Sequence, residues 1–353
     1  MKLLSALLLP CLFAAIAPCA AAQSGEGYAT YRVTFDAAWS SSSHPGAFPG
    51  GAHFSPLIGA THSSALQLWS AGGMASNGIE SMAETGSTVG LNSQVNSAIV
   101  GGTAGQVLQG AGASATDSIS IVFTVTDDFP LVSLVTMIAP SPDWFVGVDS
   151  VALLENDAWI DQKVISLFAY DAGTDSGTQF TSPNSNTSPQ QPISAITSGP
   201  LGGAAALGTL TFERLSSALE IGICNNPPGS LALSGPVELG GSLNFTFHNP
   251  LGTTTAPATT FLGISFLAIP GQPCGITVPG LGLASFSAPG DLLLGNLSRI
   301  LVGPTWSGSP VSMPVTIPNA PVLVGVEVYA QGALVDGAGA LGATSGFKLI
   351  IGA

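Results

Sequence analysis

The sequence contains very few charged residues, and basic residues are the scarcest. Only 7% of its 353 residues are charged, with six Lys plus Arg against 20 Asp plus Glu, which gives a formal net charge of −14. Soluble domains usually carry about 25% charged residues. So few basic side chains exclude an extended basic patch. We therefore expect neither nucleic acid nor an anionic membrane surface as a partner.

Long hydrophobic runs are missing as well, except at the N-terminus. Residues 1–22 contain Lys2, an apolar stretch from Leu3 to Ile16 and a run of alanines, which is typical of a secretory signal peptide cleaved near Ala22–Gln23. No later run reaches the ~18 apolar residues of a membrane helix. We expect a protein without a transmembrane segment that is secreted, extracellular or held at the cell surface.

Cysteine is nearly absent from the mature chain. Cys11 and Cys19 lie in the expected signal peptide, which leaves Cys224 and Cys274. In an exported chain, two remaining cysteines predict one disulfide bond.

Glycine and proline are abundant, with 45 and 26 residues, and they separate short apolar runs. The stretch "YATYRVTFDAAW" alternates with period two, as a half-buried strand does. Such runs predict an all-β fold of antiparallel sandwiches or jelly rolls. No stretch shows a sustained helical pattern, "WIDQKVISLFAY" fits a strand or a short helix, and we expect residues 101–118 to form a long flexible loop.

The composition changes near residues 215–223. Most acidic residues and three of the four histidines precede this point, and both mature cysteines follow it. We expect one domain at 23–215 and a second, Gly/Pro-rich β-sandwich or jelly-roll-like domain at 221–353.

The stretch "YDAGTDSG" places Asp171 and Asp175 four residues apart among small residues. A tight loop of this kind can direct several oxygen atoms inward, and Ca²⁺ takes six to eight oxygen ligands. A third carboxylate from another loop would be needed. Without one, a solvated polar turn is the simpler interpretation.

Several motifs occur together in a distinctive order: "YRVTFDAAWS", "LQLWSAGGMASNGIESMAETG", "PSPDWFVGVD", "YDAGTDSGTQFTSPN" and "PQQPISAIT". From about Tyr28 to Thr197 the chain resembles the spondin N-terminal domain family. This resemblance implies an antiparallel, C2-like β-sandwich that binds calcium through Asp143, Asp171 and Asp175. It also implies an extracellular-matrix or adhesion role. The reeler and thrombospondin-type modules that accompany the domain in animals are not seen here, so no particular partner is implied.

The second part contains "CNNPPGSL", "PCG" and "VLVGVEVYAQGALVD". These phrases resemble a Gly/Pro-rich module of secreted proteins from planctomycete-like bacteria. The resemblance implies an exported bacterial protein and no activity.

The expected function is that of an exported, calcium-binding, non-catalytic adhesion protein whose partner is an extracellular protein or glycan. Two alternatives stay open: an enzyme that acts on an extracellular polymer and holds a structural calcium ion, and a structural cell-envelope component. We expect no catalytic residues, because there is no G-x-S-x-G motif and no sugar-binding platform beside the acids. The spacing of His44, His53 and His62 matches no zinc motif.

Overall fold

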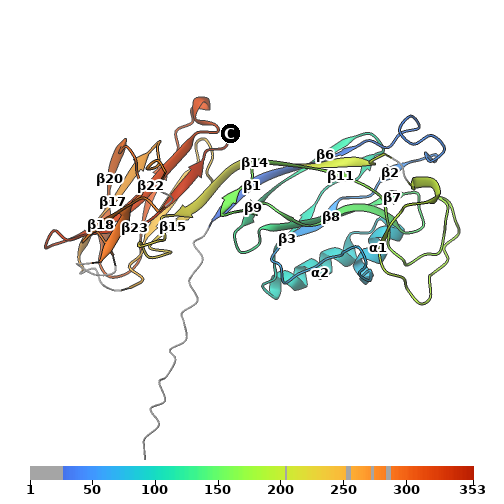
Figure 1. The fold of residues 1–353 in the computed structure, drawn as a ribbon, viewed down its shortest axis with the longest axis horizontal. Coiled ribbons are helices and arrows are strands. Elements are labelled where there is room, and N and C mark those ends of the chain that lie inside the picture. Colours follow the sequence, from blue (N-terminus) through green and yellow to red (C-terminus); the bar gives the residue numbers. More distant parts are fainter. Residues whose placement is uncertain (1–26, 203–204, 252–255, 272–273, 284–287) are drawn as a thin grey trace, which may run out of the picture.

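The computed structural model describes residues 27–202, 205–251, 256–271, 274–283 and 288–353. The expected signal peptide at 1–22 lies outside the described residues. Antiparallel strands dominate the described chain, which confirms the all-β sandwich fold. The strands form two bodies that lie end to end along the long axis of the molecule (Figure 1).

Two facing sheets build the first body. One contains β6 (Ser118–Thr126), β1 (Tyr28–Ala37), β14 (Gly208–Ile221) and β11 (Gln162–Leu167). The other contains β13 (Ser194–Ala195), β12 (Tyr170–Asp171), β8 (Trp144–Ala152), β7 (Leu131–Ala139), β2 (His53–Phe54), β5 (Ala113–Ser114), β3 (Ile58–His62) and β4 (Ala104–Gln109). A small hairpin joins β9 (Leu154–Glu155) to β10 (Ala158–Trp159).

The pattern of β1 shows how the sequence specifies this core. Ala29, Tyr31, Val33 and Phe35 are all 0% exposed, while the residues between them are only partly buried. Side chains of a strand alternate between its two faces, so this period-two sequence directs one row into the space between the sheets. The assignment of β11 also settles the "WIDQKVISLFAY" segment as a strand.

Two helices cover the outer face of the second sheet, α1 (Asn77–Thr85) and α2 (Val89–Val100) (Figure 1). They correct the expectation that no segment is helical. Ser76 caps α1 by accepting a hydrogen bond from the Ile79 N–H, and Gly86 ends the helix at φ 70°. Ile79 and Met82 pack against the sheet in one hydrophobic cluster with Phe145. The helix therefore depends on apolar contacts at i and i+3 spacing over only nine residues.

The expected flexible loop at residues 101–118 is also wrong. The segment contains β4 and β5 and ends at the first residue of β6. Strand β4 pairs with β3, which in turn pairs with β7. Strand β4 has few apolar residues, so its own sequence does not predict a strand. It is held by hydrogen bonds to the neighbouring strand β3.

The second body packs one larger sheet against a smaller one. The larger contains the end of β14, β23 (Leu341–Ile350), β22 (Glu327–Asp336), β17 (Ala258–Ser265) and β20 (Arg299–Trp306). The smaller contains β15 (Leu231–Ser234), β16 (Ser242–Phe247) and β21 (Val311–Thr316). A hairpin of β18 (Ile276–Pro279) and β19 (Pro289–Leu292) and the short 3-10 helices η1 (Gly199–Leu201) and η2 (Pro321–Leu323) complete the described elements.

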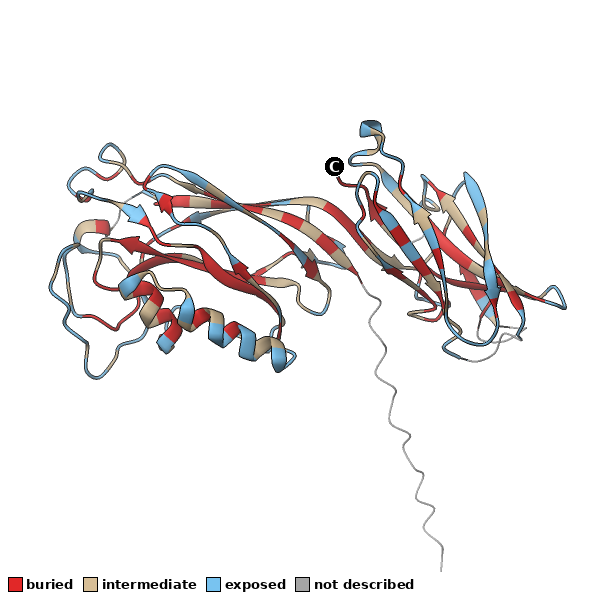
Figure 2. Ribbon diagram, turned by 180° about the vertical axis from the view of Figure 1, so that it is seen from behind, coloured by how far each residue is buried: buried red, intermediate tan, exposed pale blue. Residues whose placement is uncertain are grey.

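Strand β14 crosses the proposed boundary at 215–223. Its first part pairs with β1 and β11, and its end pairs with β23, so one sheet extends through both bodies. A separate hydrophobic cluster lies on each side of this crossing, visible as buried strand residues in Figure 2. The Tyr28 hydroxyl also donates to the Gly235 carbonyl across the junction, at 2.5 Å. The division into two domains stays a prediction.

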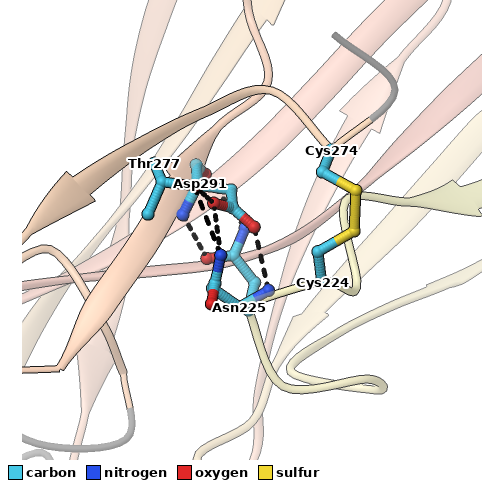
Figure 3. The surroundings of a disulfide bond; sticks show 6 residues. Cys224, Asn225, Cys274, Thr277 and Asp291 are labelled. Carbon is cyan, nitrogen blue, oxygen red and sulfur yellow. Dashed lines mark hydrogen bonds between the residues drawn. A yellow bond between two sulfur atoms is a disulfide. The ribbon is translucent and has the colours of Figure 1, made fainter.

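The predicted Cys224–Cys274 disulfide is present, with 5.8 Å between the two Cα atoms. It closes a separation of 50 residues beside the buried carboxylate of Asp291 (Figure 3). Among the described residues, no helix combines the length and apolar character needed to span a membrane.

Candidate metal centre

The pairing of β8 with β12 brings the candidate acids into one neighbourhood. Asp171 pairs with Trp144, so the residue before β8 lies beside the residues after β12. The Ala172 N–H donates to the Asp143 carbonyl at 3.1 Å, which fixes this approach. Sheet register thus joins positions that are far apart in the sequence, as the resemblance implied for Asp143 and the 171–175 loop.

Asp143 is fully buried, but only one of its two carboxylate oxygens is hydrogen-bonded. It is 0% exposed, and its Oδ2 accepts hydrogen bonds from the Thr174 N–H (2.8 Å), the Asp175 N–H (3.0 Å) and the Thr174 hydroxyl (3.3 Å). Its Oδ1 is buried and has no hydrogen-bond partner. A buried carboxylate oxygen without a donor is unfavourable, and such atoms in native proteins call for an explanation.

Asp171 and Asp175 are bonded to the backbone of their own loop. Asp171 Oδ1 accepts from the Gly173 N–H at 2.8 Å. Asp175 Oδ1 accepts from the Gly177 N–H at 2.6 Å, and its Oδ2 accepts from the Ser185 N–H at 2.9 Å. These bonds shape the loop, and each oxygen keeps a second lone pair that could face a cation.

Gly173 is required by the shape of this loop. Its φ is +73°, and a Cβ built there would lie 2.2 Å from the Gln191 carbonyl oxygen. The Gln191 N–H in turn donates to the Gly173 carbonyl at 2.9 Å. A side chain at this position would separate the two backbones, so glycine allows the close approach that positions Asp171 and Asp175.

Burial and like charges raise the pKa values of Asp143 and Asp171. Burial raises the pKa of Asp143 to about 6; the N–H groups of Thr174 and Asp175 oppose this rise, and the charge of Asp171 adds to it. Burial likewise raises the pKa of Asp171; the Gly173 N–H and the Trp144 side chain oppose the rise, and Asp175 adds to it. The charged neighbours that shift both groups are carboxylates, so a cation would relieve the repulsion.

Glu84 is a fourth acid in this neighbourhood, and no sequence motif points to it. Burial raises its pKa; Thr174 lowers it through a side-chain hydrogen bond, and Glu80 and Asp175 raise it. Its Oε1 is buried without a hydrogen-bond partner. Glu84 lies on α1, so the signal that could have revealed it was the helix itself: Ser76 and Gly86 at the two ends of an amphipathic segment.

The acids are neighbours without forming a complete ligand set. Within the described ranges, no group of three or more His, Cys, Asp and Glu side chains is arranged to hold a metal ion. The orphaned oxygens of Asp143 and Glu84 and the carboxylate repulsion nevertheless fit a hard cation with oxygen ligands. The calcium assignment of Asp143, Asp171 and Asp175 stays a prediction.

The three early histidines each bond to nearby groups. His44 contacts the Ser43 hydroxyl and the Ala205 carbonyl, and His53 contacts the Gly51 carbonyl. His62 contacts the Ser63 carbonyl and the Ser133 hydroxyl. These contacts agree with a structural role for the three rings.

Known proteins match this chain mainly over its first body. The family model described as Spondin_N matches residues 29–205. Spondin-2 of Homo sapiens is 40% identical over 210 residues, which cover 56% of this chain and 62% of the relative. Spondin-1 of Gallus gallus is 35% identical over 227 residues, which cover 58% of this chain and 27% of the relative. The matched part is therefore less than two thirds of either relative.

Proposed function

Because this chain belongs to the Spondin_N family, we propose that it is an exported adhesion or matrix-type protein that binds calcium and works without catalysis. The observation that carries the calcium proposal is the buried, partnerless Oδ1 of Asp143 beside other carboxylates. The sequence of residues 1–22 supports export, and the resemblance of the second part supports a bacterial origin. The partner would be an extracellular protein or glycan.

We assign the proposed ion to Asp143, Asp171 and Asp175, with Glu84 as a further oxygen donor. These residues come from three parts of the first body: the position just before β8, the end of β12 with the loop that follows it, and α1. A bound calcium ion would supply positive charge and oxygen coordination. The chain's own groups would hold the loop that spans Asp171 to Gln191, since backbone bonds from Gly177 and Ser185 already orient Asp175.

The site also offers a reason for a binding surface to form there. Ser176 is exposed and hydrogen-bonds to Ser185 across the loop, with 2.8 Å between the Ser176 nitrogen and the Ser185 carbonyl oxygen. Many residues between Ser182 and Gln191 are exposed polar groups. An ordered polar loop presents hydrogen-bonding groups to a protein or glycan with little loss of conformational entropy on binding. Calcium would therefore act on partner binding through the order of this loop.

Calcium-dependent thermal unfolding tests the proposal. We expect calcium to raise the melting temperature of the wild-type chain, and we expect Asp171→Asn with Asp175→Asn to abolish the rise. Asp117→Asn is the matched control, because Asp117 is an exposed acid on the loop before β6. Calorimetric titration with calcium and with magnesium gives the affinity and selectivity. An unchanged calcium response in the double variant would refute the assignment.

A further inference from the structure

The second body is open between its two sheets at one end. A cavity of about 370 Å³ lies there, with walls from β16 and β21 on one side and from β17, β20, β22 and β23 on the other. Most of its lining is aliphatic or aromatic. Cavities that bind small ligands have this size and apolar character, and a few polar groups orient the ligand.

The apolar wall is not sealed by the protein itself. Five side chains that line the cavity belong to the hydrophobic cluster of this body yet are only partly buried: Ile264, Leu301, Val315, Leu323 and Val328. Phe266 is 52% exposed at the same cavity. A ligand with an apolar chain would remove this surface from water, which is the main favourable contribution to such binding.

Polar groups in the lining are few, and one of them is charged. They are Ser298, Arg299 and Thr316. Arg299 is exposed and lies at the first position of β20. An arginine beside an apolar cavity provides a planar group that can bind both oxygens of a carboxylate.

Arg299 is also exceptional among the described basic residues. The other four form ion pairs: Arg32 with Glu213, Lys163 with Glu155, Arg214 with Asp161, and Lys348 with Glu327. Arg299 belongs to no ion pair in the part of the chain that the structure describes. In a protein of net charge −14, this unneutralised guanidinium is a local site for an anion.

We propose that this cavity binds a single-chain amphiphile with an anionic head, such as a fatty acid. The alkyl chain enters between the sheets against Leu301, Val315 and Val328, and the carboxylate meets Arg299. A free fatty acid and an anionic acyl lipid share this chemistry, because each has an alkyl chain and an anionic head. The inference does not depend on the calcium site, because none of its residues lies in the first body.

Calorimetric titration of the full chain with laurate below its micelle concentration tests the proposal. Free calcium is first removed from the protein solution, because it would precipitate the fatty acid. We expect one laurate per chain. Affinity should rise about fourfold with each added methylene from octanoate until the chain fills the cavity. Dodecanol should bind about tenfold more weakly than laurate, because it lacks the charge that Arg299 recognises.

Two variants separate the head from the chain. Arg299→Gln should weaken laurate binding about tenfold and leave dodecanol binding unchanged, while the control Arg32→Gln should change neither. Val328→Phe should fill the cavity and weaken both ligands; if it does not fold, Arg299→Gln, at an exposed position, still decides. Equal binding of laurate and dodecanol, or an unchanged affinity in Arg299→Gln, would overturn the proposal.

Vesicles of phosphatidylglycerol and phosphatidylcholine distinguish the source of the ligand. Binding of monomeric laurate without retention on the vesicles supports a free fatty acid as ligand. Binding of both, each weakened by Arg299→Gln, supports an acyl lipid that the cavity takes from a membrane. Retention on vesicles without any binding of monomeric laurate would overturn the cavity proposal, since the exposed apolar surface alone would then explain the association.

Discussion

The two bodies differ in how many hydrogen bonds they provide to the oxygens of a buried aspartate. Asp143 in the first body and Asp291 in the second are both 0% exposed. Asp291 Oδ1 accepts from the Asn225 side chain (2.9 Å) and the Thr277 hydroxyl (2.7 Å), and its Oδ2 accepts from the Asn225 N–H (2.8 Å). Asp143 uses only one of its two oxygens. Both carboxylate oxygens of Asp291 therefore accept hydrogen bonds from the protein, whereas Oδ1 of Asp143 accepts none.

Figure 3 shows the groups that hydrogen-bond to the Asp291 carboxylate. Asn225 follows Cys224 directly, and Thr277 lies three residues after Cys274, so the disulfide holds the two donors around the carboxylate. The main chain of Asp291 is also bonded, because Asn226 both donates to its carbonyl and accepts from its N–H. Both carboxylate oxygens of Asp291 have donors from the protein, so we expect this residue to contribute to stability.

The largest expected effect comes from Asp291→Ala. The change removes three hydrogen bonds to a charged acceptor and should lower the free energy of unfolding by about 3 kcal/mol. Denaturant unfolding of the full chain, with chelator and with excess calcium, measures it. The loss should be the same in both conditions, and Asp117→Ala should cause almost none. A loss that appears only with calcium would contradict the structural role.

Asp143→Asn should give an effect whose sign depends on calcium. At a calcium concentration of about 100 times Kd, the wild type should gain about 2.7 kcal/mol that the variant does not. With chelator, the variant should be more stable than the wild type by about 1 kcal/mol, because it buries no charge. The same unfolding assay measures both values. Destabilisation of equal size in both conditions would place Asp143 in the same class as Asp291.

The stability of the calcium-free chain should also depend on pH. The pKa of Asp143 in the folded chain, about 6, lies above its ordinary value of 3.8. Protonation therefore favours the folded state: this contribution is full below pH 3.8 and is lost as the pH rises through about 6. Calcium-free wild type should lose stability over this window, and Asp143→Asn should lack that slope. A parallel pH profile in both proteins would contradict the raised pKa.

Much of the fold and part of the candidate site could be predicted from the sequence. Period-two runs such as Tyr28–Ala37 predict their strands because the burial of alternate residues is a local property. The two remaining cysteines predict their disulfide because few pairings exist. The "DAGTDSG" loop and Asp143 were found together through the family resemblance, and the register of β8 and β12 explains their proximity.

The missed features depend on contacts between distant segments. Helix α1 is short, and its stability comes from packing against β7 and β8, so Glu84 was not placed near the acids. Strand β4 depends on β3 for its hydrogen bonds. Arg299 is one arginine in a sequence, and only the paired state of the other basic side chains makes it distinctive. None of these relations is local in sequence.

The most direct measurement of the central claim is the calcium content of the purified chain after equilibrium dialysis, determined by mass spectrometry of the metal. We expect one calcium ion per chain for the wild type and for Asp117→Asn, and none for Asp143→Asn. We also expect Glu84→Gln to bind calcium more weakly than the wild type. A wild-type chain that retains no calcium, or an Asp143→Asn chain that retains as much as the wild type, would contradict the claim.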